Sequence, residues 1–478
     1  MNSEIKLYNT KSKSIEPFIP IKEGSVSIYS CGPTVYHYQH LGNMRAAVFA
    51  DTLHRMFVSQ GYTVKHIINI TDVGHLVGDG DEGEDKLEKG AAREGKTVWE
   101  IAEMYTKAYL EDLTALNINL GEYTFPRATD NIQEQIDLIK VLEEKGYTYR
   151  INDGIYFDTS KFSDYSSFAK LNIEGLESGA RVAENKEKRN ITDFALWKFS
   201  PLHEKRQMEW ESPWGTGFPG WHIECSAMSM KYLGNHFDIH TGGIEHISVH
   251  HTNEIAQSEC ATGETYANYW MHNNHLQDTT GKMSKSSGDF LTVTTLIEKN
   301  YNPLAFRYFL MTAHYRKELS FSFEALDAAS VAYKKLEDFV LQHTGDKGVV
   351  NDNYMKLFMS ALKDDLATPE AVATIWKMMK DETISDEDRY ITLVEMSKLL
   401  GLGLDSVQHS PEEEIPEDVQ ALLDARTLAR TKRDFAESDR LRDEIATLGY
   451  LVKDTSSGQT LEKNSLFIKK PLGVTREV

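Results

Sequence analysis

The chain has 478 residues, of which 40% are hydrophobic and 26% charged, and its formal net charge is −21. This length exceeds what one hydrophobic core supports and suggests about three domains, while no apolar run approaches the ~20 residues of a membrane span. The acidic charge argues against non-specific binding to nucleic acid or anionic lipid, and three cysteines are too few for a disulfide framework, so with no signal peptide we expect a cytoplasmic protein.

A βαβ unit is predicted near the N-terminus. Residues 25–30 (SVSIYS) are typical of a buried strand, residues 42–61 have helical apolar spacing, and residues 62–71 (YTVKHIINIT) indicate a second strand. This order implies a parallel sheet that binds ligands at the carboxyl ends of its strands. The intervening loop ends in HLGN at 40–43, where the free N–H groups of a helix N-terminus would face a phosphate.

An insertion is expected to split this sheet. Residues 121–200 hold a helical run and two strand-like runs around an Asn-Asp-Gly turn at 152–154. The alternation then resumes with a helix at 221–234, a strand at 237–243, a helix at 252–263 and a strand at 266–272. The acidic run at 77–86 lacks the spacing of an EF-hand and is interpreted as a solvated loop.

Helices are expected to dominate beyond residue 301. One of them begins near Thr368, which we predict as the N-cap, with Pro369 in the first helical position. A polar linker at 409–418 precedes a small terminal domain. From Ala425 on, eleven Lys and Arg residues stand against eight Asp and Glu residues. This tail could meet a polyanion, although a chance fluctuation of charge explains the count equally well.

Four residues could together hold a metal ion. His250 and Glu254 are four apart and share one helical face, while Cys225 and Cys31 belong to other elements of the same predicted sheet. Two thiolates, one imidazole and one carboxylate are a ligand set for four-coordinate zinc. A simpler interpretation stays open, in which the His/Glu pair lies on the surface and the cysteines are small buried hydrophobes.

A second loop carries two lysines. The sequence GKMSKSSGD at 281–289 holds Lys282 and Lys285 between glycines, which suits a mobile clamp over a polyphosphate. The loop lacks the spacing of a Walker motif, and a lysine–serine loop taken alone is more often simply solvated.

Several motifs, in order along the chain, resemble those of one family. The HLGN and KMSKS sequences are similar to the two nucleotide motifs of class I aminoacyl-tRNA synthetases, and the whole chain resembles the cysteinyl-tRNA synthetase family. The shared motifs are CGPTVYHYQHLGN, NITD, GWHIECSAMS, GNHFDIH, HHTNEIAQ, YWMH and KMSKS, followed by the tail DRLRDEIATLGYLVKDTSSGQT. The chain departs from the family at Leu41 and Asn43, where Ile and a second His are common, and in the segment GIEHISVHH.

The resemblance implies an α/β fold, with a Rossmann-like parallel-sheet catalytic domain split by an insertion, then a helical domain and a small C-terminal domain. The expected limits are residues 1–120 and 201–300 for the two catalytic halves, 121–200 for the connective insertion, 301–408 for a stem-contact segment and helical tRNA-binding domain, and 416–478 for an anticodon-recognition domain.

The resemblance also implies a reaction. L-Cysteine and ATP would give cysteinyl-adenylate and pyrophosphate, and the 3′-terminal ribose of tRNA(Cys) would then take the cysteinyl group. The family's ATP-binding and catalytic roles fall on His40, Gly42 and Asn43 near the α-phosphate and on Lys282 and Lys285 at the β- and γ-phosphates. Mg²⁺ would accompany ATP, and a monomer is expected.

In this family zinc would select the substrate side chain. The matching ligands are Cys31, Cys225, His250 and Glu254, for one zinc ion per chain. A soft, thiolate-rich site would favour the thiolate of cysteine over the hydroxyl of serine, so no editing domain would be needed. Trp221, Gly32 and Thr71 would line the pocket for the cysteine side chain, although Trp221 also fits a plain core aromatic.

Two other functions would use some of the same residues. A ligase that joins cysteine to an amino sugar shares the adenylating core and the zinc site, but it has no anticodon-type tail like the one that follows Pro416. A catalytically inactive, zinc-stabilised RNA-binding relative would have no reason to keep His40, Lys282 and Lys285 together.

Overall fold

The computed structural model describes residues 4–74, 85–170, 186–201, 206–278, 281–282, 291–343, 347–407, 416–455 and 458–463. The chain divides into two compact units, Met1–Val407 and Gln408–Val478. Nearly all of the acidic run at 77–86 lies outside the described residues.

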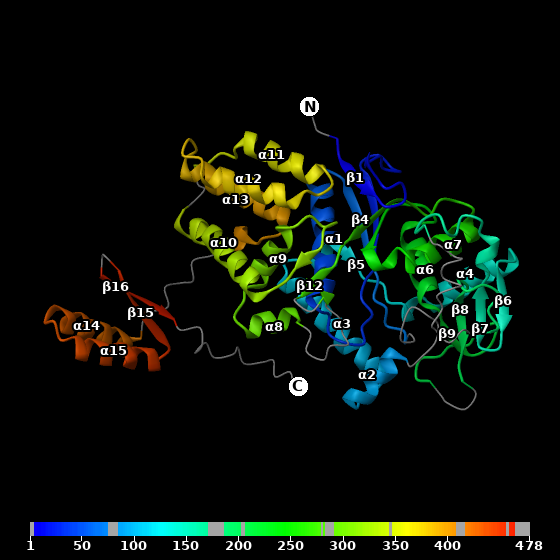
Figure 1. The fold of residues 1–478 in the computed structure, drawn as a ribbon, viewed down its shortest axis with the longest axis horizontal. Coiled ribbons are helices and arrows are strands. Elements are labelled where there is room, and N and C mark those ends of the chain that lie inside the picture. Colours follow the sequence, from blue (N-terminus) through cyan, green and yellow to red (C-terminus); the bar gives the residue numbers. More distant parts are fainter. Residues whose placement is uncertain are drawn as a thin grey trace. The chain divides into compact units, whose positions relative to one another are not determined.

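A five-stranded parallel sheet forms the centre of the first unit (Figure 1). In order across the sheet, its strands are β11 (Ala267–Asn273), β10 (Phe237–Gly243), β3 (Ser25–Ser30), β4 (Thr63–Ile68) and β5 (Tyr123–Thr124). From β3 the chain moves toward β4, and from β10 it moves in the opposite direction, toward β11. The strand order therefore reverses between β3 and β10, which is where parallel α/β sheets form their ligand crevice.

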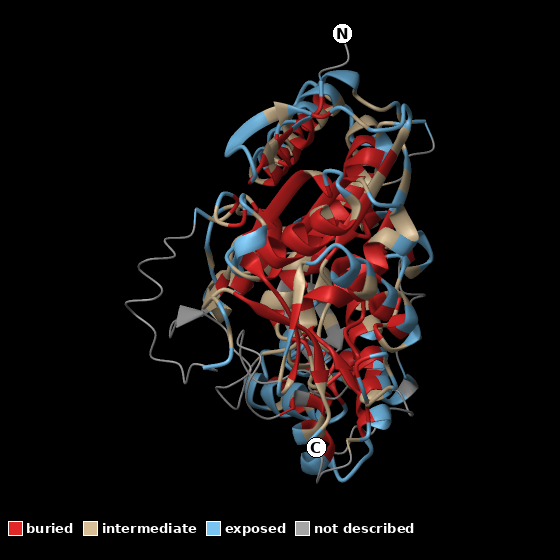
Figure 2. Ribbon diagram, turned by 90° about the vertical axis from the view of Figure 1, so that its right-hand side faces the viewer, coloured by how far each residue is buried: buried red, intermediate tan, exposed pale blue. Residues whose placement is uncertain are grey.

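Helices cover both faces of this sheet. The helices on one face are α1 (Leu41–Ser59) and α3 (Val98–Ala115), and those on the other are α4 (Ile132–Glu144), α6 (Trp221–Leu233) and α7 (His250–Thr262). Neighbouring residues of β3 show the alternation, since Ile28 packs in the core that contains α1 and Tyr29 packs in the core that contains α6. Figure 2 shows the central strands buried between the helices. The predicted α/β class with a parallel sheet is confirmed.

Smaller sheets flank the central one. An antiparallel sheet consists of β6 (Thr148–Ile151), β7 (Gly154–Phe157), β8 (Phe194–Phe199) and β9 (Gly217–Pro219), and β1 (Lys6–Asn9) pairs with β2 (Ser14–Pro17). The turn predicted at 152–154 joins β6 to β7. A three-stranded sheet has the order β13 (Gly281–Lys282), β12 (Leu276–Asp278) and β14 (Leu319–Ser320).

The rest of the first unit is helical. Its helices are α2 (Lys86–Glu94), α8 (Val293–Glu298), α9 (Pro303–Met311), α10 (Phe323–Gln342), α11 (Asp352–Lys363), α12 (Thr368–Met379) and α13 (Asp386–Leu400). The predicted cap of α12 is wrong by one residue. Thr368 is already helical, and the N-cap is Ala367, whose side chain cannot accept a hydrogen bond.

The second unit is a helical hairpin with a β-ribbon. It contains α14 (Glu417–Thr431), α15 (Phe435–Thr447), β15 (Tyr450–Thr455) and β16 (Gly458–Lys463). Val419, Leu423 and Ile445 form its small buried core. Across the part of the chain that the structure describes, no helix is both long and apolar enough to cross a membrane.

Candidate functional site

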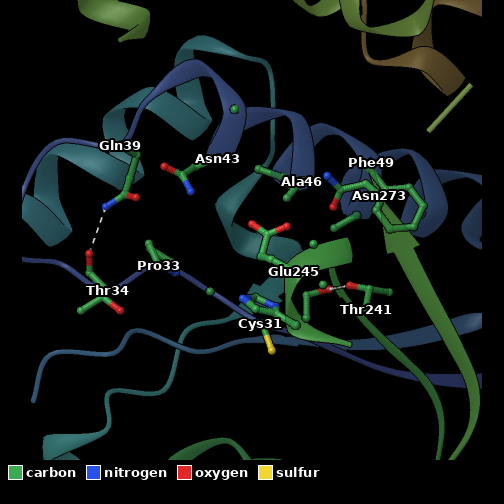
Figure 3. A pocket seen from close by; sticks show the side chains of 18 of the residues that line it. Cys31, Pro33, Thr34, Gln39, Asn43, Ala46, Phe49, Thr241, Glu245 and Asn273 are labelled. Atoms are coloured by element: carbon green, nitrogen blue, oxygen red, sulfur yellow. Dashed lines mark hydrogen bonds between the residues drawn. The ribbon is translucent and has the colours of Figure 1, made fainter. Parts of the chain in front are cut away.

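A cavity of about 410 Å³ opens where the strand order reverses, at the carboxyl ends of β3 and β10. Seven of the predicted site residues line it, namely Cys31, Gly32, His40, Gly42, Asn43, Trp221 and His250. Figure 3 shows the Asn43 side chain on the α1 wall, with Cys31 across the cavity and its sulfur directed away from Asn43. The cavity therefore joins the predicted phosphate motif to the predicted metal ligands.

The HLGN motif forms the N-terminal cap of α1. His40 is the N-cap residue, and its Nδ1 accepts the backbone N–H of Asn43 at 3.2 Å. In return the backbone N–H of His40 donates to Asn43 Oδ1 at 3.2 Å. Because Nδ1 accepts, the proton of the neutral imidazole lies on Nε2, which leaves this atom as a donor. The cap thus orients two side chains at a helix N-terminus, where an anion is stabilised.

Gly32 lies where two strand ends approach each other. Its N–H donates to Asn69 Oδ1 at 2.8 Å, and a Cβ at this position would stand 1.6 Å from the carbonyl oxygen of Asn69. Only glycine permits this approach. Thr71 is buried at 2% exposure and accepts from Asn69 Nδ2 at 3.0 Å, behind the residues that line the cavity.

The four predicted metal ligands come together. The ligand atoms of Cys31, Cys225, His250 and Glu254 all lie within 4.8 Å of one another. They arrive from the end of β3, from α6 and from two successive turns of α7. Three of them are buried, whereas Cys31 is half-buried and faces the cavity. Two sulfurs, one nitrogen and one oxygen at this spacing fit a tetrahedral zinc ion.

The electrostatics of the cluster suit a cation. A hydrogen bond from Cys31 lowers the pKa of the Cys225 thiol to about 7 against the effect of burial, with His250 helping. Burial raises the pKa of Cys31 well above its ordinary value, and Cys225 and Glu254 add to this rise. Burial would raise the pKa of Glu254, but His240 and His250 hold it well below its usual range. Burial would lower the pKa of His250, but Glu254 and Cys225 raise it to about 10. The buried cluster therefore holds a carboxylate and a readily ionised thiol balanced by a protonated imidazole, and a bound metal ion would take over that balancing charge as the protons leave.

A second layer of histidines surrounds these ligands. His222 Nδ1 lies 3.0 Å from His250 Nδ1, His240 Nε2 lies 2.9 Å from Glu254 Oε2, and His251 Nε2 lies 3.2 Å from Cys31 Sγ. His251 Nδ1 in turn contacts His272 Nε2 at 2.7 Å. These rings orient the ligands from behind, as outer partners of metal sites do.

Sequence reasoning did not single out these histidines. The available signal was a polar residue within an apolar buried strand, as at His240 in β10 and His272 in β11. Cys31, His240, His251 and Glu254 also satisfy the spacing for a metal ion. His240 and His251 do not line the cavity, whereas Cys31 and His250 of the first set do, so only the first set presents two ligands to a substrate there.

Two further side chains shape the cavity. Trp221 is the first residue of α6, and its ring centroid lies 4.4 Å from that of His250. Glu245 is the second residue after β10, and Figure 3 shows its carboxylate in the cavity between α1 and Cys31. Sequence reasoning missed Glu245, although its place just after the carboxyl end of a central strand was a usable signal.

The strand that pairs with the start of the lysine loop borders the same cavity. The backbone of Lys282 pairs with Gln277 in the sheet of β12 and β13, and Leu276 at the start of β12 lines the cavity. Lys285 lies outside the described residues.

Comparisons with known proteins agree with this geometry. Residues 17–331 match the family model for the class I (C) tRNA synthetase catalytic domain, and residues 412–461 match the cysteinyl-tRNA ligase anticodon binding domain. The chain is 49% identical over 458 residues to a Burkholderia lata protein named cysteine–tRNA ligase 1, with 96% of each chain covered. It is 41% identical over 490 residues to a Treponema denticola cysteine–tRNA ligase, with 96% of this chain and 99% of the relative covered.

Solved structures share the fold at low identity. A methionyl-tRNA synthetase from Mycobacterium tuberculosis, bound to methionyl-adenylate, superposes with a TM-score of 0.52 at 15% identity, covering 87% of this chain and 96% of that one. A LeuRS–tRNA–LeuAMS complex from Agrobacterium radiobacter gives 0.57 at 11% identity, covering 82% of this chain and 85% of that one. These matches concern the arrangement of the sheet and helices.

Proposed function

The chain belongs to the cysteinyl-tRNA synthetase family of class I aminoacyl-tRNA synthetases, and from this premise we propose how its cavity activates cysteine. The family's reaction joins L-cysteine to tRNA(Cys) with ATP. A cysteine carboxylate oxygen attacks the α-phosphorus of ATP, the bond to the β-phosphate oxygen breaks, and pyrophosphate leaves. A hydroxyl of the 3′-terminal ribose of tRNA then attacks the carbonyl carbon of the adenylate, and AMP leaves.

The first step is assigned to the cap of α1. An in-line displacement at phosphorus requires positioning and charge stabilisation more than covalent chemistry. His40 Nε2 and the side-chain Nδ2 of Asn43 donate to the α-phosphate. Gly42 leaves room for the His40 ring in this cap, since a Cβ there would stand 2.9 Å from it. Lys282 and Lys285 neutralise the β- and γ-phosphates, and Mg²⁺ enters with ATP.

Selection of cysteine is assigned to the metal cluster. The support is the donor set itself, with four ligand atoms within 4.8 Å, of which two are sulfur, at the end of the cavity opposite Asn43. Cys31, Cys225, His250 and Glu254 would hold one zinc ion, and His222 and His240 would keep the imidazole and the carboxylate in place. Zinc held there supplies a Lewis acid that favours the thiolate of cysteine over the hydroxyl of serine.

The cavity orients the amino acid between these two places. Trp221 packs against the substrate side chain beside His250, and Gly32 lets the backbone approach it. Thr71 supports this wall from behind through Asn69. A substrate with its sulfur at Cys31 and its carboxylate toward Asn43 would present the attacking oxygen to the phosphate motif.

The remaining domains are assigned to tRNA. We propose residues 1–120 and 201–300 as the catalytic halves, 121–200 as the connective insertion, 301–408 as a stem-contact segment and helical tRNA-binding domain, and 416–478 as the anticodon-recognition domain. The match of residues 412–461 to an anticodon binding domain supports this and disfavours an amino-sugar ligase. A monomeric, cytoplasmic enzyme stays a prediction from the sequence.

The proposed function is tested by measuring the transfer of labelled cysteine to tRNA with ATP and Mg²⁺, in the presence of excess serine. We expect base-labile label on the tRNA that serine does not reduce. Cysteine-dependent pyrophosphate exchange without charging would instead indicate an amino-sugar ligase, and neither activity in a zinc-loaded protein would indicate a binding protein.

A further inference from the structure

One arginine joins the two nucleotide motifs. Arg45 lies on α1, two residues after Asn43, and is only 3% exposed. Its Nη1 donates to the carbonyl oxygen of His275, and its Nη2 donates to the carbonyl oxygens of His314, at 3.3 Å, and Lys317. Arg45 does not line the cavity at the metal cluster, so it acts through other groups and does not touch the substrate.

The three carbonyls belong to the frame of the lysine loop. His275 immediately precedes β12, whose Gln277 pairs with Lys282 of β13. The segment with His314 and Lys317 leads into β14, which pairs in parallel with β12. The carbonyl of His275 accepts both from Arg45 and from the N–H of Leu319 at 3.2 Å. A single guanidinium therefore holds both neighbouring segments of this small sheet against α1.

The far side of the lysine loop is tied to the same helix. The N–H of Leu41, the first residue of α1, donates to the carbonyl oxygen of Leu291 at 2.9 Å. Leu291 follows the lysine loop as His275 precedes it. Both flanks of the 281–289 segment thus contact the first turns of α1.

The chemistry of Arg45 is unusual for a purely structural ion. Burial lowers its pKa to about 10, so the guanidinium remains charged at neutral pH. Among the described residues no carboxylate pairs with it, and its printed partners are backbone carbonyls alone. Burying an unpaired cation is costly, and a fixed fork of five donors is suited to holding several acceptors in one geometry.

We propose that Arg45 is a positioning residue for ATP, which sets the strand that carries Lys282 in register with the His40–Asn43 cap. The inference rests on the proposed function, in which the cap receives the α-phosphate and the lysines receive the β- and γ-phosphates. Displacement of the lysine frame from the cap weakens ATP binding and adenylate formation, while the cysteine end of the cavity is unchanged.

The variants are Arg45→Gln and Arg45→Lys, with Arg55→Gln as the matched control. Arg55 lies on the same helix, and it also donates to backbone carbonyls, those of Lys398 and Asn117, which lie far from the lysine loop in the sequence. Unlike Arg45, it also pairs with a carboxylate, that of Asp51, at 2.7 Å. Cysteine-dependent ATP–pyrophosphate exchange gives the kcat and KM for each substrate, and thermal unfolding and zinc content are measured on the same samples.

For Arg45→Gln we expect kcat/KM for ATP to fall about 10- to 100-fold, as misplacement of catalytic groups by about 1 Å does, with KM for cysteine and zinc content unchanged. A lysine at position 45 can reach one of the two segments but cannot bridge both. The kcat/KM of Arg45→Lys for ATP should therefore lie between that of Arg45→Gln and that of the parent. Arg55→Gln should lose stability without the change in ATP kinetics.

Two failures are distinguishable. If the parent protein shows no cysteine-dependent exchange, the proposed function itself is wrong. If the parent is active and the Arg45 variants match Arg55→Gln in ATP kinetics, Arg45 is structural only and the proposal is overturned. If Arg45→Gln fails to fold, the ATP kinetics of Arg45→Lys decide whether Arg45 is a positioning residue or structural only.

Discussion

Arg307 on α9 donates to the carboxylate of Asp51 on α1, and neither residue is more than 2% exposed. The same guanidinium donates to the carbonyl oxygens of Leu400 and Leu116, each at 2.7 Å. Four segments distant in sequence thus meet at one buried ion pair. Since α1 also carries the phosphate cap, this pair anchors the helix on which the chemistry depends.

The Asp51→Asn substitution should destabilise the first unit by about 3–5 kcal/mol, because removing one partner leaves the Arg307 charge buried and uncompensated. Chemical unfolding with urea would measure the loss. Lys398→Gln is the control, since Lys398 and Glu395 form an exposed pair whose removal should cost no more than about 1 kcal/mol. Equal losses in the free energy of unfolding for the two variants would contradict the anchoring role of the Asp51–Arg307 pair.

The same pair predicts a pH dependence. Burial alone would raise the pKa of Asp51, but Arg307 and Arg55 hold it below its ordinary value. A carboxyl with a lowered folded-state pKa stabilises the fold above its unfolded pKa, and this contribution disappears as pH falls through the folded pKa. The stability difference between the parent and Asp51→Asn should therefore be constant near neutrality and shrink below about pH 4. A difference that widens on acidification would refute this.

The Cys225→Ser substitution should lower zinc affinity at least about tenfold and reduce discrimination against serine, because a hard hydroxyl replaces a soft ligand. Metal analysis after dialysis against a chelator, and pyrophosphate exchange with each amino acid, provide the readouts. Cys260→Ser is the matched control, because Cys260 is also a buried free cysteine but belongs to neither candidate metal group. Full zinc retention in Cys225→Ser would remove Cys225 from the ligand set.

Zinc binding should strengthen as pH rises. Burial, with Cys225 and Glu254, raises the pKa of Cys31, so its thiol is protonated near neutral pH until a metal displaces the proton. Affinity should then increase about tenfold per pH unit for each proton released. Competition with a chelator of known pH dependence between pH 6 and 8, with proton release in weak buffer, measures this. A pH-independent affinity would mean that Cys31 is not a ligand.

Gly32→Ala should destabilise the fold by more than the roughly 1–3 kcal/mol of ordinary overpacking, because the new Cβ meets the backbone carbonyl of Asn69 and not a movable side chain. It should also depress cysteine activation. Gly121→Ala is the control, since its Cβ would have only an ordinary contact at 3.5 Å with Asn119 Oδ1. Thermal unfolding of both variants, with pyrophosphate exchange, is the measurement, and similar behaviour of the two would be the contrary result.

The central sheet was predictable because its signals are local. Buried strands are short runs of apolar and β-branched residues, and the predictions at 25–30 and 237–243 coincide with β3 and β10. The small sheet of β12, β13 and β14 was not predicted, because strands of two or three residues depend on partners supplied by tertiary contacts. The start of α12 shows the same limit. The N-cap is Ala367 and not the predicted Thr368, because the path of the preceding segment decides where the helix begins.

The candidate site was predictable in part for a related reason. Cys31, Cys225, His250 and Glu254 have residue types that suggest a metal, and the parallel topology suggests their meeting. Arg45 has no such signal. Its partners are backbone carbonyls around residues 275 and 314–317, and any residue type could supply them. Only the three-dimensional arrangement shows this contact.

Cys31 and Glu254 stand 223 positions apart in the chain. At a synthesis rate of about 5–20 residues per second, roughly 10 to 45 seconds separate the completion of one ligand from that of the other. During that interval only part of the candidate ligand set exists, and pairing of β10 with β3 must bring the remainder together. Long-range strand pairing forms late, because the loop must first be closed. Assembly of the four candidate ligands therefore waits for the long-range pairing that builds the central sheet, and no local segment of the chain can complete it alone.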